Sequence, residues 1–443
     1  MNIVILGAGD IGSFLAIFLS QEQHNVTVID RDQEKLFNLS QLADVATFWG
    51  SGTDLNNLEE IMRGKPDLFL SMTNNDETNL VACTLVKNLG SIKTIARLKN
   101  FSRSSKVDFS RLFFVDYYIL PEVVVAHEII KTLFHPACSF VENLAHGAVQ
   151  MKTVFLNDNC YHNKKLSELS LESLLVGLIK RKGNTIIFPR GEEMILPGDE
   201  VTFIGKTDKM QELYKKIGIR SKKIDSVVLI GGSQVSIHLS GLLKEKGISV
   251  KIIEKDEKKC HLLARKLPTT TIIHQDGVNP SFLLSEHVEK ADCIITSTNC
   301  DEKNILAATF IKQAGCKEVI AVISDHNFTP MLHHLNIHSV VSEKLIIANR
   351  ILAIIHSDGN AISVTSLYEN QAKVMEFKIT SKTKAVGIPL SDLRPLLPKE
   401  CLIGMIETQG KIIIPTGSST LSPGDTAIIL TTPEHVTQLQ SIF

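Results

Sequence analysis

The sequence contains no run of about 20 apolar residues, the length that a membrane-spanning helix needs. Its most apolar helical stretch, residues 345–357 (LIIANRILAIIHS), is interrupted by Arg350. A strand-like apolar run starts at Asn2 with no basic segment before it, which argues against a signal peptide. We therefore expect a soluble, cytoplasmic chain that inserts no segment into a membrane and reaches one only through a partner.

Charge imbalance and chemical motifs are also missing. The formal net charge is −1, so bulk electrostatics favour neither nucleic acid nor an anionic membrane as a partner. The 8 cysteines form no Cys-x-x-Cys pair, which predicts reduced, buried thiols. His333 and His334 have no third ligand at metal-binding spacing, and HExxH, GxSxG and P-loop motifs are absent. We predict no catalytic residue and no metal site.

What the sequence does contain is a repeat of about half its length. NIVILGAGDIGSFLA at Asn2 matches SVVLIGGSQVSIHLS at Ser226, and DLFLSMTNNDETNL at Asp67 matches DCIITSTNCDEKNI at Asp292. Near the end of each copy, IIFPRGEEMILPGDEV matches IIIPTGSSTLSPGDTA. This period is far longer than that of a solenoid repeat, so it indicates a duplicated module with two lobes.

Each copy changes character midway. Its first part alternates short apolar runs with helical patterns, which predicts βαβ units and a doubly wound parallel sheet. Its second part has shorter strands and glycine-rich turns, typical of a small lobe with hairpins. We expect an α/β fold in which a Rossmann-like doubly wound parallel sheet is duplicated and each copy is followed by a small α+β C-terminal lobe. The expected divisions are 1–121 (first Rossmann-like lobe), 122–138 (crossover helix), 139–221 (first small lobe), 222–342 (second Rossmann-like lobe), 343–358 (crossover helix) and 359–443 (second small lobe).

The first copy carries an intact dinucleotide fingerprint, GAGDIG, between a predicted strand and a predicted helix. Gly7 suits a tight turn, Gly9 lets the backbone approach a pyrophosphate, and Gly12 lets helix and strand pack closely. Asp30 ends the second apolar run, where a carboxylate can accept hydrogen bonds from an adenosine ribose. Arg31 would suit a 2′-phosphate, but Asp30 would repel one, so NAD or an adenine nucleotide is favoured over NADP.

Further polar residues follow the other predicted strands, at the edge where open α/β sheets bind ligands. Gly52, Thr53 and Asp54 follow the third run, and Thr73 and Asn74 follow the fourth. For Thr73 a ligand contact and a structural role are equally open. Asp54 and Asp76 also suit helix capping, with local turn hydrogen bonds for Asp76 and Asn79. Arg97 places a charge at a strand end, which suits a phosphate or an acidic partner.

Several stretches of the chain resemble a known family. ILGAGDIGSFLA, VIDRD, GTDLNNLEE, TNNDETNLVACTLVKNLG and ARLKN resemble the N-terminal lobe of domains that regulate potassium conductance (RCK domains), and the Pro-Gly-Asp hairpins resemble their C-terminal lobe. Two such units without a membrane segment resemble the TrkA family, peripheral regulatory subunits of bacterial Trk potassium uptake systems.

This resemblance implies a cytoplasmic homo-oligomer, a tetramer, at the inner face of the membrane beneath a potassium-translocating subunit of the TrkH type. It implies NAD(H) as the ligand, with ATP and ADP as further regulatory ligands. It also places Glu122 near the junction of lobes or subunits. The candidate binding residues of the first copy are Gly7, Ala8, Gly9, Asp10, Ile11, Gly12, Asp30, Arg31, Gly52, Thr53, Asp54, Thr73, Asn74, Arg97 and Glu122.

The second copy departs from this pattern. Ser233 replaces Gly9, Ser236 replaces Gly12, and Val322 replaces Arg97, while Glu254 keeps an acid in the place of Asp30. We expect Ser236 to crowd the helix–strand contact and Ser233 to crowd the phosphate, so that nucleotide binds there more weakly or differently. One copy would then sense ligand and the other support assembly. The candidate residues of the second copy are Gly231, Ser233, Gln234, Val235, Glu254 and Thr298.

Two other functions stay open at the level of the residues. A soluble NAD-dependent oxidoreductase with a duplicated fold would need a proton-transfer residue in the cleft, and no such residue is evident. A structural tether would leave both clefts empty. The expected function is a nucleotide-sensing regulatory subunit that gates a membrane potassium transporter and is not an enzyme.

Overall fold

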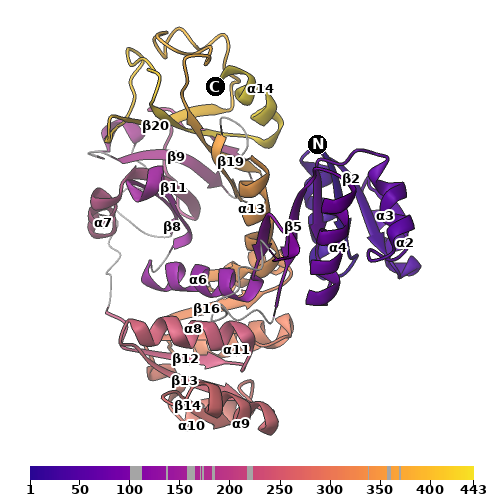
Figure 1. Ribbon diagram of the computed structural model, residues 1–443. Coiled ribbons are helices and arrows are strands. Elements are labelled where there is room, and N and C mark those ends of the chain that lie inside the picture. Colours follow the sequence, from indigo (N-terminus) through magenta and orange to yellow (C-terminus); the bar gives the residue numbers. More distant parts are fainter. Residues whose placement is uncertain are drawn as a thin grey trace. The chain divides into compact units, whose positions relative to one another are not determined.

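The computed structural model describes residues 1–99, 112–135, 138–156, 165–169, 171, 174–181, 185–216, 223–337, 339–356, 361–368 and 371–443. These residues form two compact units, Met1–Ala126 with Ile346–Ala348 and His127–Leu345 with Asn349–Phe443 (Figure 1). Cys160 and the turn of the hairpin expected at residues 182–184 lie outside the described ranges.

The first unit is built on a six-stranded parallel sheet in the order β3-β2-β1-β4-β5-β6. Because the strand order reverses between β1 and β4, the crevice outside the carboxyl ends of the strands is the expected place for a ligand. The strands are β1 (Asn2–Leu6), β2 (Asn25–Asp30), β3 (Ala46–Trp49), β4 (Leu68–Ser71), β5 (Lys93–Arg97) and β6 (Tyr117–Ile119). The helices are α1 (Asp10–Gln21), α2 (Gln33–Leu42), α3 (Leu55–Met62), α4 (Asp76–Leu89) and α6 (Pro121–Phe134).

Side-chain caps fix where these helices begin. Asp54 caps α3 as expected, since its carboxylate accepts a hydrogen bond from the backbone N–H of Asn56 at 2.9 Å. The expectation that Asp76 caps α4 is wrong, because Asn75 is the cap and accepts from the N–H of Thr78 at 2.6 Å. Asp76 is the first helical residue, and its carboxylate instead accepts from the backbone N–H of Lys99 at 2.9 Å.

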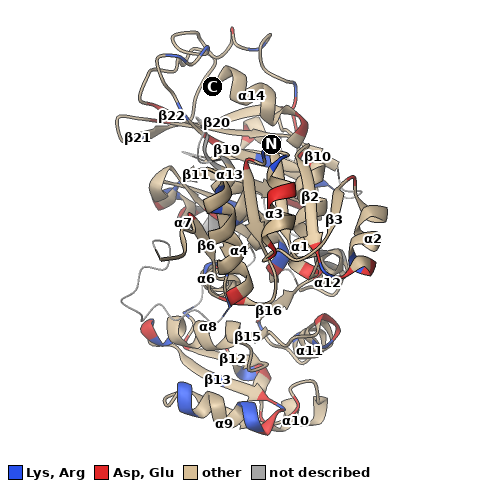
Figure 2. Cartoon of the chain, turned by 45° about the vertical axis from the view of Figure 1, so that its right-hand side comes forward, with Lys and Arg blue, Asp and Glu red and all other residues tan. Residues whose placement is uncertain are grey.

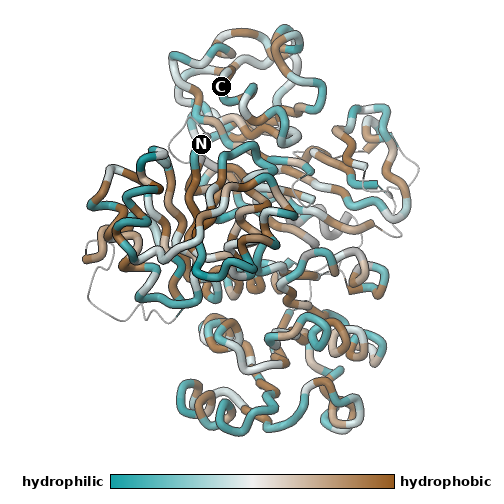
Figure 3. The backbone as a smooth tube through the Cα atoms, turned by 90° about the vertical axis from the view of Figure 1, so that its right-hand side faces the viewer, coloured by the Kyte–Doolittle hydropathy of each residue, from teal (hydrophilic) through white to brown (hydrophobic). Residues whose placement is uncertain are grey.

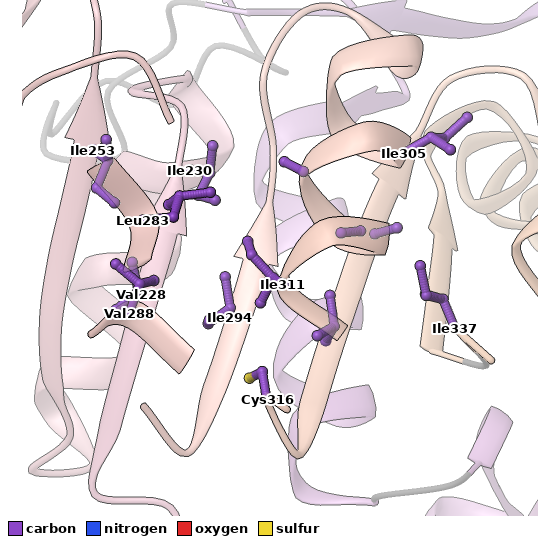
Figure 4. Close-up of a cluster of buried hydrophobic side chains, with 14 of the residues drawn as sticks. Val228, Ile230, Ile253, Leu283, Val288, Ile294, Ile305, Ile311, Cys316 and Ile337 are labelled. Atoms are coloured by element: carbon purple, nitrogen blue, oxygen red, sulfur yellow. The ribbon is translucent and has the colours of Figure 1, made fainter. Parts of the chain in front are cut away.

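The second unit repeats the parallel sheet in the order β14-β13-β12-β15-β16-β17. Side chains of its strands and of α11 pack into one core, in which Ile230, Ile253 and Ile294 lie with Ile305 and Ile311 (Figure 4). The strands are β12 (Ser226–Ile230), β13 (Ser249–Glu254), β14 (Thr271–His274), β15 (Cys293–Thr296), β16 (Glu318–Ile323) and β17 (Ser339–Ser342). The helices are α8 (Gln234–Glu245), α9 (Glu257–Lys266), α10 (Pro280–Ser285), α11 (Asp301–Gln313), α12 (Thr329–His334) and α13 (Glu343–His356).

The same unit contains both small lobes, each an antiparallel sheet of five strands. The strand orders, β10-β9-β11-β8-β7 and β21-β20-β22-β19-β18, are equivalent, which confirms the duplicated fold expected from the sequence. The first lobe comprises β7 (Cys138–Leu144), β8 (Val149–Leu156), β9 (Leu174–Arg181), β10 (Thr185–Ile187), β11 (Asp199–Lys206) and α7 (Thr207–Lys216). The second comprises β18 (Ala361–Leu367), β19 (Ala372–Lys378), β20 (Cys401–Thr408), β21 (Lys411–Ile413), β22 (Thr426–Thr431) and α14 (Val436–Ile442).

The two small lobes share a hydrophobic core, which the sequence did not predict. A single buried cluster contains Met151, Leu178 and Ile204 from the first lobe and Met405 and Leu430 from the second. Apolar stretches run along the strands and hydrophilic ones gather at the turns (Figure 3). The two lobes of one chain therefore bury one another's apolar faces, as the two sheets of a β-sandwich do.

The crossover helices are integral parts of the core, as their apolar content predicts. Ile129 and Leu133 of α6 are buried, and the ammonium group of Lys246 lies 5.0 Å from the ring centre of Phe134. The helix ends at Phe134, before the boundary at 138 expected from the sequence. Among the described residues, no helix combines the length and the apolar content that crossing a membrane requires.

Candidate functional site

The turn between β1 and α1 is built around two glycines with different roles. Gly7 has a φ of +104°, a conformation that side chains disfavour, and its N–H donates to the carbonyl of Ile29 at 2.8 Å. A Cβ atom added at Gly12 would lie 1.8 Å from the carbonyl oxygen of Gly7. Gly7 thus makes the tight turn, and Gly12 allows α1 to begin directly against it.

Gly9 leaves the N-terminus of α1 open. It is the N-cap residue of α1, and no side chain forms a capping hydrogen bond there. A Cβ atom at Gly9 would meet no other atom within 4 Å. The first N–H groups of a helix have no intrahelical acceptor and carry the positive end of the helix dipole. The arrangement therefore suits an anionic group such as a phosphate.

Asp30 and Arg31 form the next part of the site, at the end of β2. One carboxylate oxygen of Asp30 accepts from the N–H of Ala8 at 2.6 Å and the other from the N–H of Asp32 at 2.9 Å. The carboxylate is therefore held against the glycine turn. The guanidinium of Arg31 donates to the hydroxyl of Ser51 at 2.6 Å and to that of Thr53 at 3.4 Å.

Sequence reasoning missed two residues beside Arg31. Ser51 receives the hydrogen bond from the guanidinium, and the indole N–H of Trp49 donates to the carbonyl oxygen of Arg31 at 3.0 Å. Trp49 is the last residue of β3 and Ser51 lies in the loop after it, so their position at the carboxyl end of a strand was the available signal. Because the sequence contains 1 tryptophan, Trp49 is also a natural fluorescence reporter beside this edge.

The hydroxyl of Thr73 forms hydrogen bonds within the protein. Its hydroxyl donates to the side-chain oxygen of Asn79 at 2.7 Å, and Asn79 is fully buried. Asn79 also accepts from the hydroxyl of Ser71 at 3.0 Å and donates to the carbonyl oxygen of Arg97 at 2.7 Å. The structural reading of Asn79 is therefore correct, and this asparagine joins the ends of β4 and β5 to α4.

Arg97 at the end of β5, Asn74 after β4 and Glu122 in the first turn of α6 interact with one another. A guanidinium N–H of Arg97 donates to the side-chain oxygen of Asn74 at 2.9 Å. Burial raises the pKa of Glu122, and the charges of Arg97 and Lys99 oppose that shift. Electrostatics thus couple Glu122, on α6, to the arginine at the end of β5.

The remaining candidate residues of the first copy lie beside the carboxyl edge of the parallel sheet or in the loops that pack against it. Asp10 is exposed in the first turn of α1, and Ile11 beside it is half-buried. A Cβ atom at Gly52 would lie 2.3 Å from the side chain of Leu6, so this loop packs directly on β1. Asp54 uses its carboxylate to cap α3. The structure thus places Gly7 to Gly12, Asp30, Arg31, Thr73, Asn74 and Arg97 along one edge of the sheet.

The second copy accommodates Ser236, contrary to the expected crowding of the helix–strand contact. Ser236 is fully buried, and its hydroxyl donates to the carbonyl oxygen of Gly231 at 2.6 Å. The hydroxyl of Ser233 accepts from the N–H of Ser236 at 3.2 Å and so caps α8. A pocket of about 180 Å³ lies at this edge and is lined by Gly231, Ser233, Glu254 and Thr298 among others, but not by Gln234 or Val235.

These features define a class of protein, a duplicated Rossmann-like nucleotide-binding fold with paired small lobes. Family models for the TrkA-N domain match residues 3–121 and 227–343, and models for the TrkA-C domain match residues 153–218 and 374–443. The chain is 30% identical to the Trk system potassium uptake protein TrkA homolog 2 of Methanosarcina mazei, with 100% of each chain covered. It is 26% identical to the Trk system potassium uptake protein TrkA of Haemophilus influenzae, with 100% of this chain and 98% of the relative covered.

Solved structures show the same fold. The GsuK channel superposes with a TM-score of 0.63 at 18% identity, covering 100% of this chain and 78% of that one. The GsuK channel bound to NAD gives a TM-score of 0.62 at 18% identity with the same coverage. The chain belongs to the TrkA family of potassium uptake proteins. The relatives named above are described as potassium uptake proteins and not as enzymes, in agreement with the expectation from the sequence.

Proposed function

We propose that this chain is a peripheral regulatory subunit that binds NAD(H) or an adenine nucleotide in its first cleft and thereby gates a potassium-translocating membrane protein of the TrkH type. The observation that carries the proposal is the open N-terminus of α1 behind Gly9, where the helix has no side-chain cap. A pyrophosphate suits this position, and Asp30 lies where it can accept from ribose hydroxyls. GsuK, which has the same fold, is described as bound to NAD in one solved structure and as bound to ADP in another.

Gating would follow from differential affinity. A ligand shifts a conformational equilibrium only as far as it binds one state more tightly than the other. Arg97 and Glu122 lie at the far end of the first cleft, and Glu122 is in the first turn of α6. Ligands that contact this end differently would favour different positions of α6, which runs from the first unit into the second.

Each copy carries an exposed apolar residue that supports assembly into a homo-oligomer. Val81 of α4 and Leu306 of α11 occupy equivalent positions and are 42% and 62% exposed. Exposed apolar side chains at the same place in both copies suit an interface between chains. We propose that these helices take part in a tetramer at the inner face of the membrane.

Ligand binding can be tested by titrating the full chain with NAD, NADH, ATP and ADP, following Trp49 fluorescence and heat release. We expect saturable binding to the unmodified chain and at least a tenfold loss of affinity in Asp30→Ala. Asp67→Asn is the matched control, because Asp67 binds the backbone N–H of Asn2 at the opposite end of the sheet. Binding that is absent, or lost equally in both variants, would refute the proposed site.

Gating can be tested by measuring potassium flux through vesicles that contain the membrane partner, with and without this chain. We expect flux to depend on nucleotide with the unmodified chain and to lose that dependence with Asp30→Ala. Flux that requires the chain but ignores nucleotide would indicate a structural tether instead.

A further inference from the structure

Helix α9 of the second unit carries a strongly basic surface. Residues 251–266, from β13 through α9, contain six basic and three acidic residues, whereas the equivalent residues 27–42 of the first copy contain two basic and three acidic residues. Figure 2 shows the basic segments of α9. Because the first copy forms the same sheet and helix without these charges, the fold does not require them.

The central charges of this surface lie on the side of α9 that points away from the sheet. Cys260 and Leu263 are the buried residues of α9. Lys258 and Arg265 are exposed and, in a helix with 3.6 residues per turn, lie on the opposite side from this buried pair. Leu262 lies between them and is 41% exposed. The outward face of α9 is therefore a basic strip about 10 Å long with one apolar side chain at its centre.

The acidic residues near this strip have other partners. Asp256 caps α9 by accepting from the backbone N–H of Lys259 at 3.1 Å, and the carboxylate of Glu257 lies 4.0 Å from the ring of His261. In the part of the chain that the structure describes, neither Lys258 nor Arg265 forms an ion pair. Their charges are therefore available to an anionic partner.

The stability of α9 explains only part of this charge. Arg265 and Lys266 lie in the last turn, where cations interact favourably with the helix dipole. Lys258 and Lys259 lie in the first turn, where the dipole disfavours cations. At the position of Lys258 the first copy has Glu34, the charge that the dipole favours. The basic first turn of α9 therefore points to a role outside the helix itself.

The composition of α9 favours a lipid surface over a protein as the partner. Lysine is depleted in protein–protein interfaces, whereas aromatic residues, methionine and arginine are enriched there. Three of the four basic residues of α9 are lysines, and the helix contains no Phe, Tyr, Trp or Met. Lysine is a hydrated point charge, and clusters of basic residues on a helix are typical of contacts with anionic lipid headgroups.

The net charge of −1 does not oppose such a contact. Charges in solution are screened beyond about 10 Å at an ionic strength of 0.1 M. A membrane surface therefore responds to the charges that lie close to it and not to the sum over the whole chain. A single basic helix face can bind anionic lipid on a chain that is nearly neutral overall.

We infer that the outward face of α9 binds directly to the anionic headgroups of a membrane, with Lys258 and Arg265 at the centre of the contact and Lys259 and Lys266 beside them. The contact lies on the headgroups and inserts no helix, because Leu262 is the one large apolar side chain that α9 exposes. It does not depend on nucleotide, since neither Lys258 nor Arg265 lines the pocket at the carboxyl edge of the second parallel sheet.

Flotation of the full chain with lipid vesicles, without a membrane partner, tests this contact. We expect binding to vesicles of phosphatidylcholine and phosphatidylglycerol in equal parts, and binding weaker by about tenfold or more to phosphatidylcholine alone. Each basic residue near an anionic membrane strengthens binding about fivefold, so Lys258→Gln combined with Arg265→Gln should weaken binding by about 30-fold. Raising the salt concentration should weaken binding of the unmodified chain as well.

Two further variants separate the position of the charge from its amount. Lys382→Gln combined with Arg394→Gln is the matched control, because it removes the same charges from exposed positions of the second small lobe and should leave vesicle binding unchanged. Lys258→Arg combined with Arg265→Lys keeps both charges on α9 and should retain binding. Retained binding there shows that the loss in the glutamine variant comes from charge and not from misfolding.

Absence of binding to the anionic vesicles, or equal losses in the two charge-removing variants, would contradict the proposal. Tighter binding to duplex DNA or to polyglutamate than to the vesicles would also overturn it, because the basic face would then belong to a nucleic acid or an acidic protein. Nucleotide binding is measured separately by calorimetry, so a failure of the proposed nucleotide site leaves the vesicle result unaffected.

Discussion

At the scale of single residues, the two copies solve the same packing problem in different ways. In the first copy α1 begins so close to the turn that a Cβ atom at Gly12 would lie 1.8 Å from the carbonyl oxygen of Gly7. In the second copy Ser236 occupies the equivalent position, and its hydroxyl donates to the carbonyl of Gly231. The space between helix and turn holds a serine side chain in the second copy, whereas in the first copy it has no room for a Cβ atom.

Substitutions at these positions should therefore differ in cost. In Gly12→Ala the new Cβ atom would push the start of α1 away from the backbone of Gly7. The substitution should lower the free energy of unfolding by about 1–3 kcal/mol or more. Ser236→Ala removes only a hydrogen bond and should cost about 1 kcal/mol. Urea unfolding of both variants, followed by circular dichroism, measures the difference. Equal losses would mean that the close approach at Gly12 is readily relaxed.

Lys152 should make stability depend on pH. Its side chain is 1% exposed, and burial lowers the pKa of its ammonium group from 10.5 to about 8. Above pH 10.5 the amine is neutral in both the folded and the unfolded chain. As the pH falls towards 8, the unfolded chain takes up the proton first, so the free energy of unfolding decreases by about 2–3 kcal/mol.

Replacing Lys152 by methionine should remove this contribution. Urea unfolding at pH 8 and pH 10 is the measurement, and the unmodified chain should be less stable at pH 8 by the amount that Lys152→Met abolishes. Lys378→Met, which removes an exposed lysine from β19, should retain the dependence. An unchanged slope in Lys152→Met would show that another group titrates in this range.

At the scale of elements, four strands of the first parallel sheet follow directly from apolar runs of the sequence. The apolar runs at residues 3–6, 26–29, 68–71 and 94–98 correspond to β1, β2, β4 and β5, because strands buried on both faces are continuous apolar runs. The start of α4 does not follow as directly, since Asn75 and Asp76 are both residue types that cap helices. Asn75 is the cap because Asp76 binds the N–H of Lys99, a contact 23 residues away along the chain. Such distant partners leave no local pattern.

Asn79 should contribute strongly to holding β4, β5 and α4 together. It is fully buried and bonds Ser71, Thr73 and the carbonyl of Arg97. Asn79→Ala leaves these groups without their buried partner and should cost about 2–4 kcal/mol. Asn75→Ala removes only the cap of the same helix and should cost about 1 kcal/mol. Thermal unfolding should rank the two variants in this order, and the reverse order would contradict the role of Asn79.

At the scale of the whole molecule, the duplication produces an internal pair of small lobes that neither copy predicts alone. Each lobe has a sheet with two apolar faces, and alternation along a strand does not reveal which surface will cover it. Contacts with the other small lobe determine which surface covers each face. The hydroxyl of Thr202 in the first lobe lies 2.5 Å from the hydroxyl of Tyr368 in the second. The carboxylate of Glu376 in the second lobe accepts a hydrogen bond from the N–H of Ala145 in the first at 2.7 Å.

The close approach of these lobes depends on Gly177. A Cβ atom at Gly177 of β9 would lie 2.9 Å from a methyl of Leu430 in the second lobe, whereas one at the equivalent Gly404 of β20 would lie 3.5 Å from Ile204 of the first lobe, an ordinary van der Waals contact. Neither glycine has a positive φ, so a side chain there would strain packing and not the backbone. Gly177→Val should push the lobes apart and cost about 1–3 kcal/mol.

Hydrogen exchange can show whether the lobes depend on each other. If the shared core stabilises both, Gly177→Val should speed the exchange of amides in β20 and β22 as well as in β9, although the substitution lies in the first lobe alone. Gly410→Ala, in the turn between β20 and β21 and away from the shared core, should speed exchange only near that turn. Loss of protection confined to β9 in Gly177→Val would mean that the small lobes fold independently and that their pairing adds little to stability.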